Sequence, residues 1–501
     1  MNRVLALLLV TGALFFVGLS SYDLDTKGEP REGFTAWEMI HTGDWALPRL
    51  NGEAIPEKPL VFPWLVALST LALGEGGELA PRLPSALMGV GLVLVVYRLG
   101  RRLQGEGFLP ALVCATTALT VSLARRARVD MTLAFFVAFA LLQFLRALER
   151  PRLATVLVFW LSVAIATLTK GPIGVALPAL AIGSYLYLEG KLAFAWRLLP
   201  GLPVFLVGAG WWYANGLRAH GYEFAHHSFL MENILMFVGA KSGGGHEHGT
   251  FYYFKYLPSH FFPWSLYLPA ALHFAWKRRG DARVAFPLAW LLSQFVFFSI
   301  ARGKRADYLL PLVPAASLIV ADLWRRGSAR ALELSSAAGA AAATAGLAVY
   351  PFAKGLAVEH LGFEPPPLFL VAGVAVAIVP WIALALGHRR SALASIAGGT
   401  TLLVLTAVTQ VLPKTQETRP FTEEVARVAG SGRLVEHGFF DYATLYYLRR
   451  RIPTVDREEA QRTLDAGGFA IVSPEAFGAR PLLRGTVVAR APDRVLLAGI
   501  R

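Results

Sequence analysis

Residues 4–19 read VLALLLVTGALFFVGL, an apolar run that no charged side chain interrupts. A helix needs about 20 such residues to cross a bilayer core of roughly 30 Å, and comparable runs recur as far as Val411. Of the 501 residues, 55% are hydrophobic and only 16% are charged. These features predict an α-helical polytopic membrane protein with about thirteen transmembrane helices.

The first apolar run is interpreted as a retained span rather than a cleaved leader. It follows only Asn2 and Arg3, as a signal peptide can, but Ser20-Ser21-Tyr22 makes a poor cleavage site. Cys114 is the only cysteine and lies inside another apolar run. A disulfide framework and a thiolate metal cluster are therefore both excluded.

The net charge of +14 does not indicate a nucleic-acid partner, because the basic residues fall in short clusters between apolar runs. With the N-terminus inside, these clusters occupy every second connection, as expected for cytoplasmic loops. The inside loops contain Arg98/Arg101/Arg102, Arg146/Arg150/Arg152, Lys191/Arg197, Lys277/Arg278/Arg279, Arg325/Arg326 and His388/Arg389/Arg390.

The same alternation places three connections and the tail outside. The outer connections are 21–82, 215–259 and the short segment around Arg302-Gly303-Lys304. For this count to hold, Leu60 to Leu73 must lie along the membrane, consistent with its shortness and its Pro63 and Trp64. We thus predict a membrane domain over 1–412, including both large outer loops, and an outer domain over 413–501.

The tail alternates between helical and extended patterns, which predicts a small α/β domain. The expected helices are Phe421–Val428 and Tyr442–Arg450, and the expected strands are Arg433–Val435, Phe469–Val472 and Val495–Leu497.

Positive charge at the predicted outer face needs a reason. It occurs at Arg125-Arg126-Arg128, at Lys170 and at Arg302/Lys304/Arg305. One interpretation is contact with lipid head groups. The other is a phosphate site, since arginine binds phosphate oxygens in pairs and lysine binds them as a point charge.

The first outer loop concentrates carboxylates and cations, including Asp25, Glu29, Arg31 and the Glu57-Lys58 pair. Sugar transfer from a lipid phosphate needs a carboxylate to accept the acceptor's proton and cations to stabilise the departing phosphate. This loop contains both. The alternative is structural, with Glu29 capping a helix and Glu57 pairing with Lys58.

The motifs of this loop form a specific set, namely Glu29-x-Arg31, Gly43-Asp44-Trp45 with Pro48, Asn51-Gly52 and Glu57-Lys58-Pro59. At this spacing the loop resembles that of the bacterial 4-amino-4-deoxy-L-arabinose lipid A transferases and of the wider family that includes protein O-mannosyltransferases. Further matches are Val129-Asp130-Met131, Thr169-Lys170-Gly171-Pro172, His248 ahead of Phe251-Tyr252-Tyr253, Pro263-Trp264-Ser265, and Lys304 with Tyr308-Leu309-Leu310-Pro311.

The resemblance implies a GT-C fold in a bacterial inner membrane, with a periplasmic active site and polyprenyl phosphate as the sugar carrier. It implies that Lys58 contacts the lipid phosphate and that Asp130 lines the catalytic cavity. It also implies a divalent metal, Zn or Mg/Mn, on Glu57 and a histidine of the second outer loop. We favour His248 over His246, and the alternative is that both are solvated. The other expected phosphate contacts are Arg31, Arg125, Arg126, Arg128, Arg302, Lys304 and Arg305.

One position departs from the family, because Gly28 stands where the family has an aspartate before the glutamate. Glu29 is then the first candidate for the catalytic carboxylate, with Asp25 and Asp130 as alternatives. A non-catalytic lipid-binding homologue stays open, as does a protein hydroxyl as acceptor in place of a lipid A-like or other envelope acceptor. A transporter is disfavoured, because the spans have almost charge-free centres and no internal repeat is visible.

Overall fold

The computed structural model describes residues 2–24, 28–54, 59–226, 248–341, 366–412, 418–438, 440–473 and 483–499. The chain divides into two compact units. We call them the helical unit (Met1–Leu19, Pro56–Phe62 and Pro84–Val411) and the loop–tail unit (Ser20–Ile55, Pro63–Leu83 and Leu412–Arg501).

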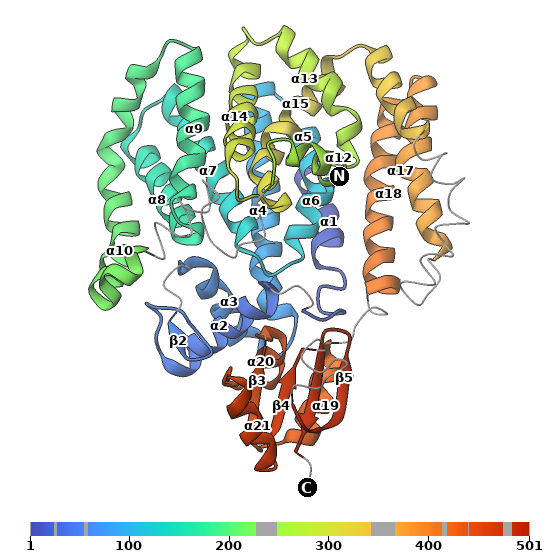
Figure 1. Cartoon of the computed structure of the whole chain (residues 1–501). Helices are drawn as coiled ribbons and strands as arrows, with labels where there is room; N and C mark the ends of the chain where they lie inside the picture. The colour runs from blue at the N-terminus through green and yellow to red at the C-terminus, as the bar shows by residue number, and fades with distance from the viewer. Residues whose placement is uncertain are drawn as a thin grey trace. The chain divides into compact units, whose positions relative to one another are not determined.

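The helical unit is a bundle of apolar helices (Figure 1). In chain order its α-helices are α1 (Arg3–Phe16), α4 (Leu79–Gln104, from Pro84), α5 (Phe108–Thr116), α6 (Ala118–Ala124), α7 (Val129–Glu149), α8 (Leu153–Lys170), α9 (Ile173–Leu188), α10 (Leu202–Ala225), α12 (Tyr252–His260), α13 (Leu268–Lys277), α14 (Ala282–Ile300), α15 (Val313–Arg326), α17 (Pro367–Ala385) and α18 (Arg389–Thr406). Short 3-10 segments include η1 (Leu192–Gly201) and η4 (Ala306–Leu312).

Seven helices within the described residues are long and apolar enough to cross a membrane, and four more are apolar but shorter. The prediction of a multi-pass membrane protein is therefore confirmed, whereas the number of about thirteen spans stays a prediction. One of the shorter helices is α3 (Val61–Leu73), the segment predicted to lie along the membrane. Its 13 residues measure about 20 Å, too short to cross the hydrocarbon core.

Close packing in the helical unit depends on small residues and on buried polar ties. A Cβ atom added at Gly91 of α4 would lie 2.7 Å from the Phe135 ring of α7, so only glycine allows this approach. Gln294 of α14 donates a 3.0 Å hydrogen bond to the Leu177 carbonyl of α9. Such a bond matters in an apolar surrounding, where an unpaired amide is costly.

The loop–tail unit contains a four-stranded sheet in the order β3-β4-β6-β5. Its strands are β3 (Leu434–His437), β4 (Phe469–Val472), β5 (Thr486–Ala491) and β6 (Arg494–Ala498), and its tail helices are α19 (Thr418–Ala429), α20 (Tyr442–Leu448) and α21 (Arg457–Asp465). β3 pairs parallel with β4, while β6 pairs antiparallel with both neighbours. The predicted α/β domain and its three expected strands are confirmed.

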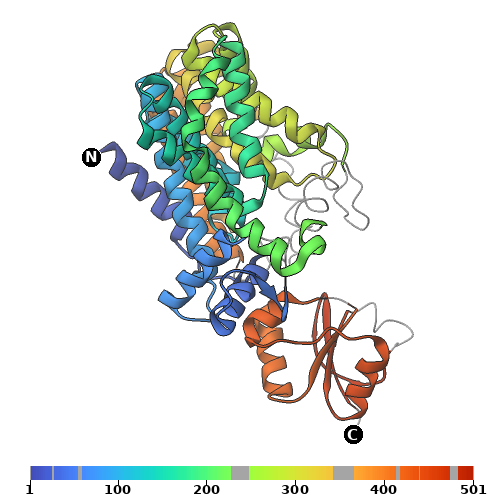
Figure 2. The same ribbon diagram turned by 90° about the vertical axis from the view of Figure 1, so that its left-hand side faces the viewer.

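The side chains of these strands alternate between two buried faces of the sheet, which explains why the strands are continuous apolar runs in the sequence. Leu434 and Ile471 belong to a core that also contains Phe421 of α19. Their neighbours Val435 and Ala470 belong to a second core on the opposite face, with residues of α21. Figure 2 shows helices on both sides of this sheet. Because side chains alternate between faces, a strand covered on both sides must be apolar at every position.

The first outer loop contributes α2 (Gly28–Thr42) and the hairpin β1 (Arg49–Leu50) to β2 (Glu53–Ala54). Gly43, with φ of 71°, follows the last residue of α2 and ends the helix. Asn51 and Gly52 have φ values of 56° and 87°, which form the tight turn that an Asn-Gly pair favours.

The tail begins at Leu412 in the loop–tail unit, close to the predicted boundary, and the same unit also contains the first outer loop. Leu24, Phe34 and Leu50 of the outer loop share a buried core with Phe421 and Leu496 of the tail. The Asn51 side chain also bonds both the N–H and the carbonyl of Ile452, at 2.9 and 2.7 Å. The loop thus buries its apolar face against the tail, an association between segments 400 residues apart that periodicity does not reveal.

Glu436 of β3 is a buried carboxyl in this unit. Its Oε2 accepts a 3.2 Å hydrogen bond from the Asp441 N–H, and its Oε1 has no partner among the described residues. Burial, and then the Asp441 charge, raise the pKa of Glu436 to about 9. The native state therefore favours the protonated carboxyl.

Glu436→Gln is expected to stabilise the protein at alkaline pH. A raised carboxyl pKa gives stability that is complete below the unfolded value, about 4.3, and is lost as pH rises toward the folded value. The loss approaches about 1.4 kcal/mol per pH unit in that window. Thermal unfolding at pH 5 and pH 8 checks this, with the exposed Glu423→Gln as control. An equal pH response in wild type and Glu436→Gln would contradict it.

Candidate functional site

Asp130 lies in the first turn of α7 and is the centre of a charged cluster in the helical unit. It is 2% exposed. Its Oδ1 accepts from Lys170 Nζ at 2.5 Å, and its Oδ2 accepts from Arg128 Nε at 3.4 Å. Both carboxylate oxygens are therefore engaged by cations.

Two further contacts join this cluster to η4. Arg128 also donates to Asp307 Oδ2 at 3.4 Å, and Lys170 Nζ lies 4.3 Å from the centre of the Tyr308 ring. Arg305, next to η4, adds a favourable charge interaction with Asp130. We call Arg128, Asp130, Lys170 and Asp307 the Asp130 cluster.

Local structure explains how the cluster forms. Arg128 is the extended residue immediately before α7, and its carbonyl accepts from Ser85 Oγ at 3.2 Å. Lys170 is the last residue of α8, which Gly171 ends with φ of 77°. A cation at a helix C-terminus and a carboxylate at a helix N-terminus are both favoured by the helix dipole. Helix ends thus bring these charges together.

The predicted cations at 302–305 have separate roles. Lys304 is buried, and its Nζ donates to the carbonyls of Ala301 and His248, the latter at 2.9 Å. Burial, and then the charge of Arg302, lower the pKa of Lys304. Arg302 is exposed, and its carbonyl accepts from the His248 N–H at 3.2 Å. Lys304 therefore ties its own segment to the one that carries His248.

His248 itself is exposed, and its ring stacks on Tyr252 with 4.2 Å between ring centres. Within the described ranges, no group of three or more His, Cys, Asp and Glu side chains is arranged to hold a metal ion. Glu57, Lys58, His246 and Asp25 lie outside the described residues. The metal and the contact of Lys58 with phosphate accordingly stay predictions.

The three arginines at 125–128 differ in their surroundings. Arg125 is 5% exposed, and its guanidinium donates to the carbonyls of Leu14 and Val17 at 2.9 and 2.8 Å. It satisfies carbonyls at the C-terminal end of α1, which have no partner within the helix. Arg126 is exposed, and only Arg128 belongs to the Asp130 cluster. The geometry thus favours a structural role for Arg125.

Glu29 is part of the loop–tail unit, where it is fully buried against Arg82. Arg82 Nε donates to Glu29 Oε1 at 2.8 Å, and Nη2 donates to Oε2 at 3.2 Å. The same guanidinium bonds the carbonyls of Tyr22 and Asp23, at 2.8 and 2.6 Å. Arg31 nearby pairs with Glu32 at 2.5 Å. This geometry favours a structural role for Glu29 over a catalytic one.

Comparison with known proteins gives the family. Residues 57–212 match the family model described as dolichyl-phosphate-mannose-protein mannosyltransferase. The undecaprenyl phosphate-alpha-4-amino-4-deoxy-L-arabinose arabinosyl transferase of Pseudomonas aeruginosa (strain LESB58) is 31% identical over 407 residues, which are 77% of this chain and 71% of the relative. The chain belongs to this arabinosyl transferase family.

The solved structures show that the fold is shared as well. ArnT from Cupriavidus metallidurans, crystallised with undecaprenyl phosphate, superposes with a TM-score of 0.83 at 22% identity, covering 99% of this chain and 98% of that one. The oligosaccharyltransferase of Archaeoglobus fulgidus superposes with a TM-score of 0.51 at 11% identity, covering 95% and 69%. The predicted GT-C-like fold is confirmed, and the protein is a membrane glycosyltransferase.

Sequence reasoning did not select one member of this transferase's charged cluster. Asp307 was not a candidate, although it follows Lys304 and Arg305 in the same short segment. An acidic residue next to an unexpected basic cluster is a usable signal for a paired site. Lys170 was noted as a misplaced cation, but its partner Asp130, 40 positions earlier, could not be assigned without the packing of α7 against α8.

Proposed function

We propose that the protein transfers a sugar from a polyprenyl phosphate to a lipid A-like or other envelope acceptor. Undecaprenyl phosphate is the first candidate for the sugar carrier. The observation that carries this proposal is the Asp130 cluster, which gathers Arg128, Lys170 and nearby Arg305 around a buried carboxylate in a membrane protein. Cations fixed in a site of low dielectric stabilise a phosphate far better than they do in water.

Transfer breaks the bond between the sugar's anomeric carbon and the phosphate oxygen, and forms a bond from that carbon to the acceptor oxygen. The departing phosphate gains negative charge, which Arg128 and Lys170 are placed to stabilise. The acceptor hydroxyl loses its proton to a base. Asp130, with both oxygens engaged, is assigned to positioning the cations. Asp25 stays a candidate base, and Glu29 becomes a weaker one.

The names of the relatives support undecaprenyl phosphate as the carrier of the donor sugar. The Pseudomonas protein is named for undecaprenyl phosphate-alpha-4-amino-4-deoxy-L-arabinose, and the Cupriavidus structure contains undecaprenyl phosphate. We extend both to this chain as a proposal. The alternation of basic loops further supports a bacterial inner membrane location with the active site and tail in the periplasm.

Two site assignments beyond the described residues complete the proposal. Lys58 is assigned to the donor phosphate, because its position in the Glu57-Lys58-Pro59 motif matches the family pattern. Glu57, with His248 or His246, is assigned to a divalent metal. Carboxylate and imidazole together suit zinc, and a carboxylate suits magnesium or manganese.

The direct test supplies the purified protein with undecaprenyl phosphate-4-amino-4-deoxy-L-arabinose and lipid A, and follows both by mass spectrometry. We expect the sugar donor to be consumed only when the acceptor is present. Lys58→Ala is expected to abolish this consumption without loss of membrane insertion, since a phosphate cation is removed, and chelation is expected to lower it if the metal is present. Lys255→Ala is the matched control, an exposed lysine of α12 that is not a candidate site residue.

Each outcome of this test bears on one assignment. Full activity of Lys58→Ala would refute the phosphate contact, and indifference to chelation would remove the metal. No turnover with any acceptor would favour the non-catalytic homologue suggested by Gly28. The match to a protein mannosyltransferase model supports a protein hydroxyl as the second candidate acceptor, and labelled glycoprotein in place of lipid A would establish it.

A further inference from the structure

A second charged site lies at the opposite end of α7 from the Asp130 cluster. It is a cavity of about 550 Å³ between α1, α4 and α7. Asp130 is in the first turn of α7 and Arg146 in the last turn. Sixteen residues of helix separate them, which is about 24 Å. The two sites therefore belong to opposite faces of the membrane.

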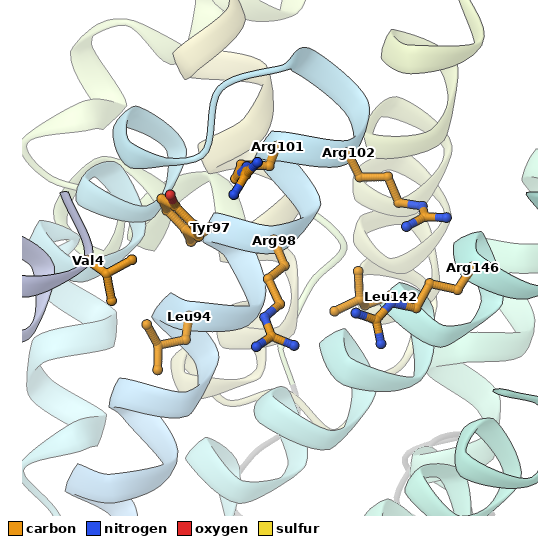
Figure 3. A pocket seen from close by; sticks show the side chains of 8 residues that line it. All are labelled: Val4, Leu94, Tyr97, Arg98, Arg101, Arg102, Leu142 and Arg146. Atoms are coloured by element: carbon orange, nitrogen blue, oxygen red, sulfur yellow. The ribbon is translucent and has the colours of Figure 1, made fainter. Parts of the chain in front are cut away.

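Four arginines line this cavity, Arg98, Arg101 and Arg102 from α4 and Arg146 from α7. Figure 3 shows Arg146 extending from α7 toward α4. The charges of Arg98 and Arg102 act unfavourably on Arg146, so these cations are close enough to repel one another. An arrangement of like charges around a cavity is stabilised when an anion enters it.

Carboxylates compensate only part of this charge. Arg102 pairs with Glu149, yet its Nε is buried without a hydrogen-bond partner among the described residues. Arg146 has a 3.4 Å contact with the neutral Gln143. In the part of the chain that the structure describes, no ion pair or side-chain hydrogen bond involves Arg98 or Arg101. The cavity is therefore left strongly positive.

Three apolar side chains and Tyr97 form the rest of the lining. Leu94 of α4 and Leu142 of α7 each lie one turn nearer the centre of their helix than Arg98 and Arg146, and Val4 is in the first turn of α1. The lining thus changes from apolar to cationic along α4 and α7. A phospholipid has the same order, with acyl chains toward the membrane centre and a phosphate at the surface.

We propose that this cavity binds the head group of an anionic phospholipid from the leaflet opposite the active site. Arginine binds phosphodiester oxygens in pairs, and basic pockets between membrane helices suit lipids that carry one or two phosphates. Occupancy would neutralise the repelling arginines and hold α1, α4 and α7 together, and hence support the helix that carries Asp130.

The test measures lipid retention by native mass spectrometry on the full-length protein in detergent. The probes are diphosphatidylglycerol, phosphatidylglycerol, phosphatidylcholine and inorganic phosphate. The pocket variant is Arg98→Gln/Arg101→Gln, whose residues have no pairing to lose. The matched control is Arg150→Gln/Arg152→Gln, two exposed arginines at the same end of the bundle that do not line the cavity.

Wild type and control are expected to retain the two anionic lipids and not phosphatidylcholine. The pocket variant is expected to bind them roughly 30-fold more weakly, because each surface charge contributes about a factor of five. Equal retention of anionic lipid by the pocket variant and wild type would overturn the proposal. Equal weakening in the pocket and control variants would also overturn it, because it indicates non-specific contact of surface arginines with head groups. Displacement of lipid by millimolar inorganic phosphate would assign the cavity to free phosphate instead.

Discussion

Asp130→Asn is expected to lower the rate of sugar transfer per folded protein by at least about 100-fold. The carboxylate receives Lys170 at 2.5 Å and Arg128 at 3.4 Å, and so holds in place both cations that we propose stabilise the departing phosphate. An amide carries no charge, and the two cations would then repel each other and separate. The measurement is initial velocity of donor consumption, normalised to monodisperse protein.

Asp322→Asn is the matched control for this change. Asp322 of α15 is 5% exposed and pairs with Arg278 at 2.6 Å and Arg326 at 3.3 Å. It therefore has comparable burial and pairing in the same unit without belonging to the Asp130 cluster. Both variants are expected to lose stability, and only Asp130→Asn is expected to lose turnover. Equal specific activity of the two would refute the site.

Glu29→Leu is expected to destabilise the loop–tail unit by about 3–5 kcal/mol, because it leaves the buried Arg82 charge uncompensated. Both partners are completely inaccessible to solvent. The midpoint of thermal unfolding in detergent measures the effect. Glu424→Gln, which removes the exposed pair with Arg427 on α19, is the control and is expected to leave the midpoint unchanged.

The double variant Glu29→Leu/Arg82→Met separates a structural from a catalytic role. Replacing both members of a buried pair with apolar side chains is often nearly neutral. If Glu29 is structural, the double variant regains stability and also activity. A stable but inactive double variant would restore Glu29 as the catalytic carboxylate and contradict the role that we infer from its pairing with Arg82.

Gly28 gains significance from this pairing. The family resemblance implies an aspartate immediately before Glu29, whereas this chain has Gly28 there, at the start of α2. Glu29, one position later, does not replace that aspartate as a base in this structure, because both of its oxygens are engaged with Arg82. We therefore expect the proton acceptor to come from elsewhere, and Asp25, outside the described residues, stays the first candidate.

Two residues of the Asp130 cluster were selected from the sequence because their positive charge violated a general rule of membrane topology. Lys170 and Arg128 are basic residues at the predicted outer face, where short loops usually lack them. Asp130 stood out by the Val129-Asp130-Met131 match. The same rule also selected Arg125, which instead donates to the carbonyls of Leu14 and Val17 at the end of α1. Charge at an unusual place shows that a partner exists, but not which partner.

The sequence by itself determined the features that depend on local pattern. Long apolar runs require a membrane, because a water-soluble fold could not bury so many apolar segments of this length. Apolar runs such as Phe469–Val472 predict strands buried on both faces, and Gly43 ends α2 because glycine adopts its positive φ without strain.

Only the tertiary structure decided which charges meet. Glu29 and Arg82 are 53 positions apart, and Arg128 and Asp307 are 179 apart. The outer loop shares its core with a tail some 400 residues later. Helical and strand periodicities act over a few residues, whereas the choice of an ionic partner depends on how whole helices pack. The sequence therefore predicted a membrane transferase with outward cations, and packing selected Asp130 as their centre.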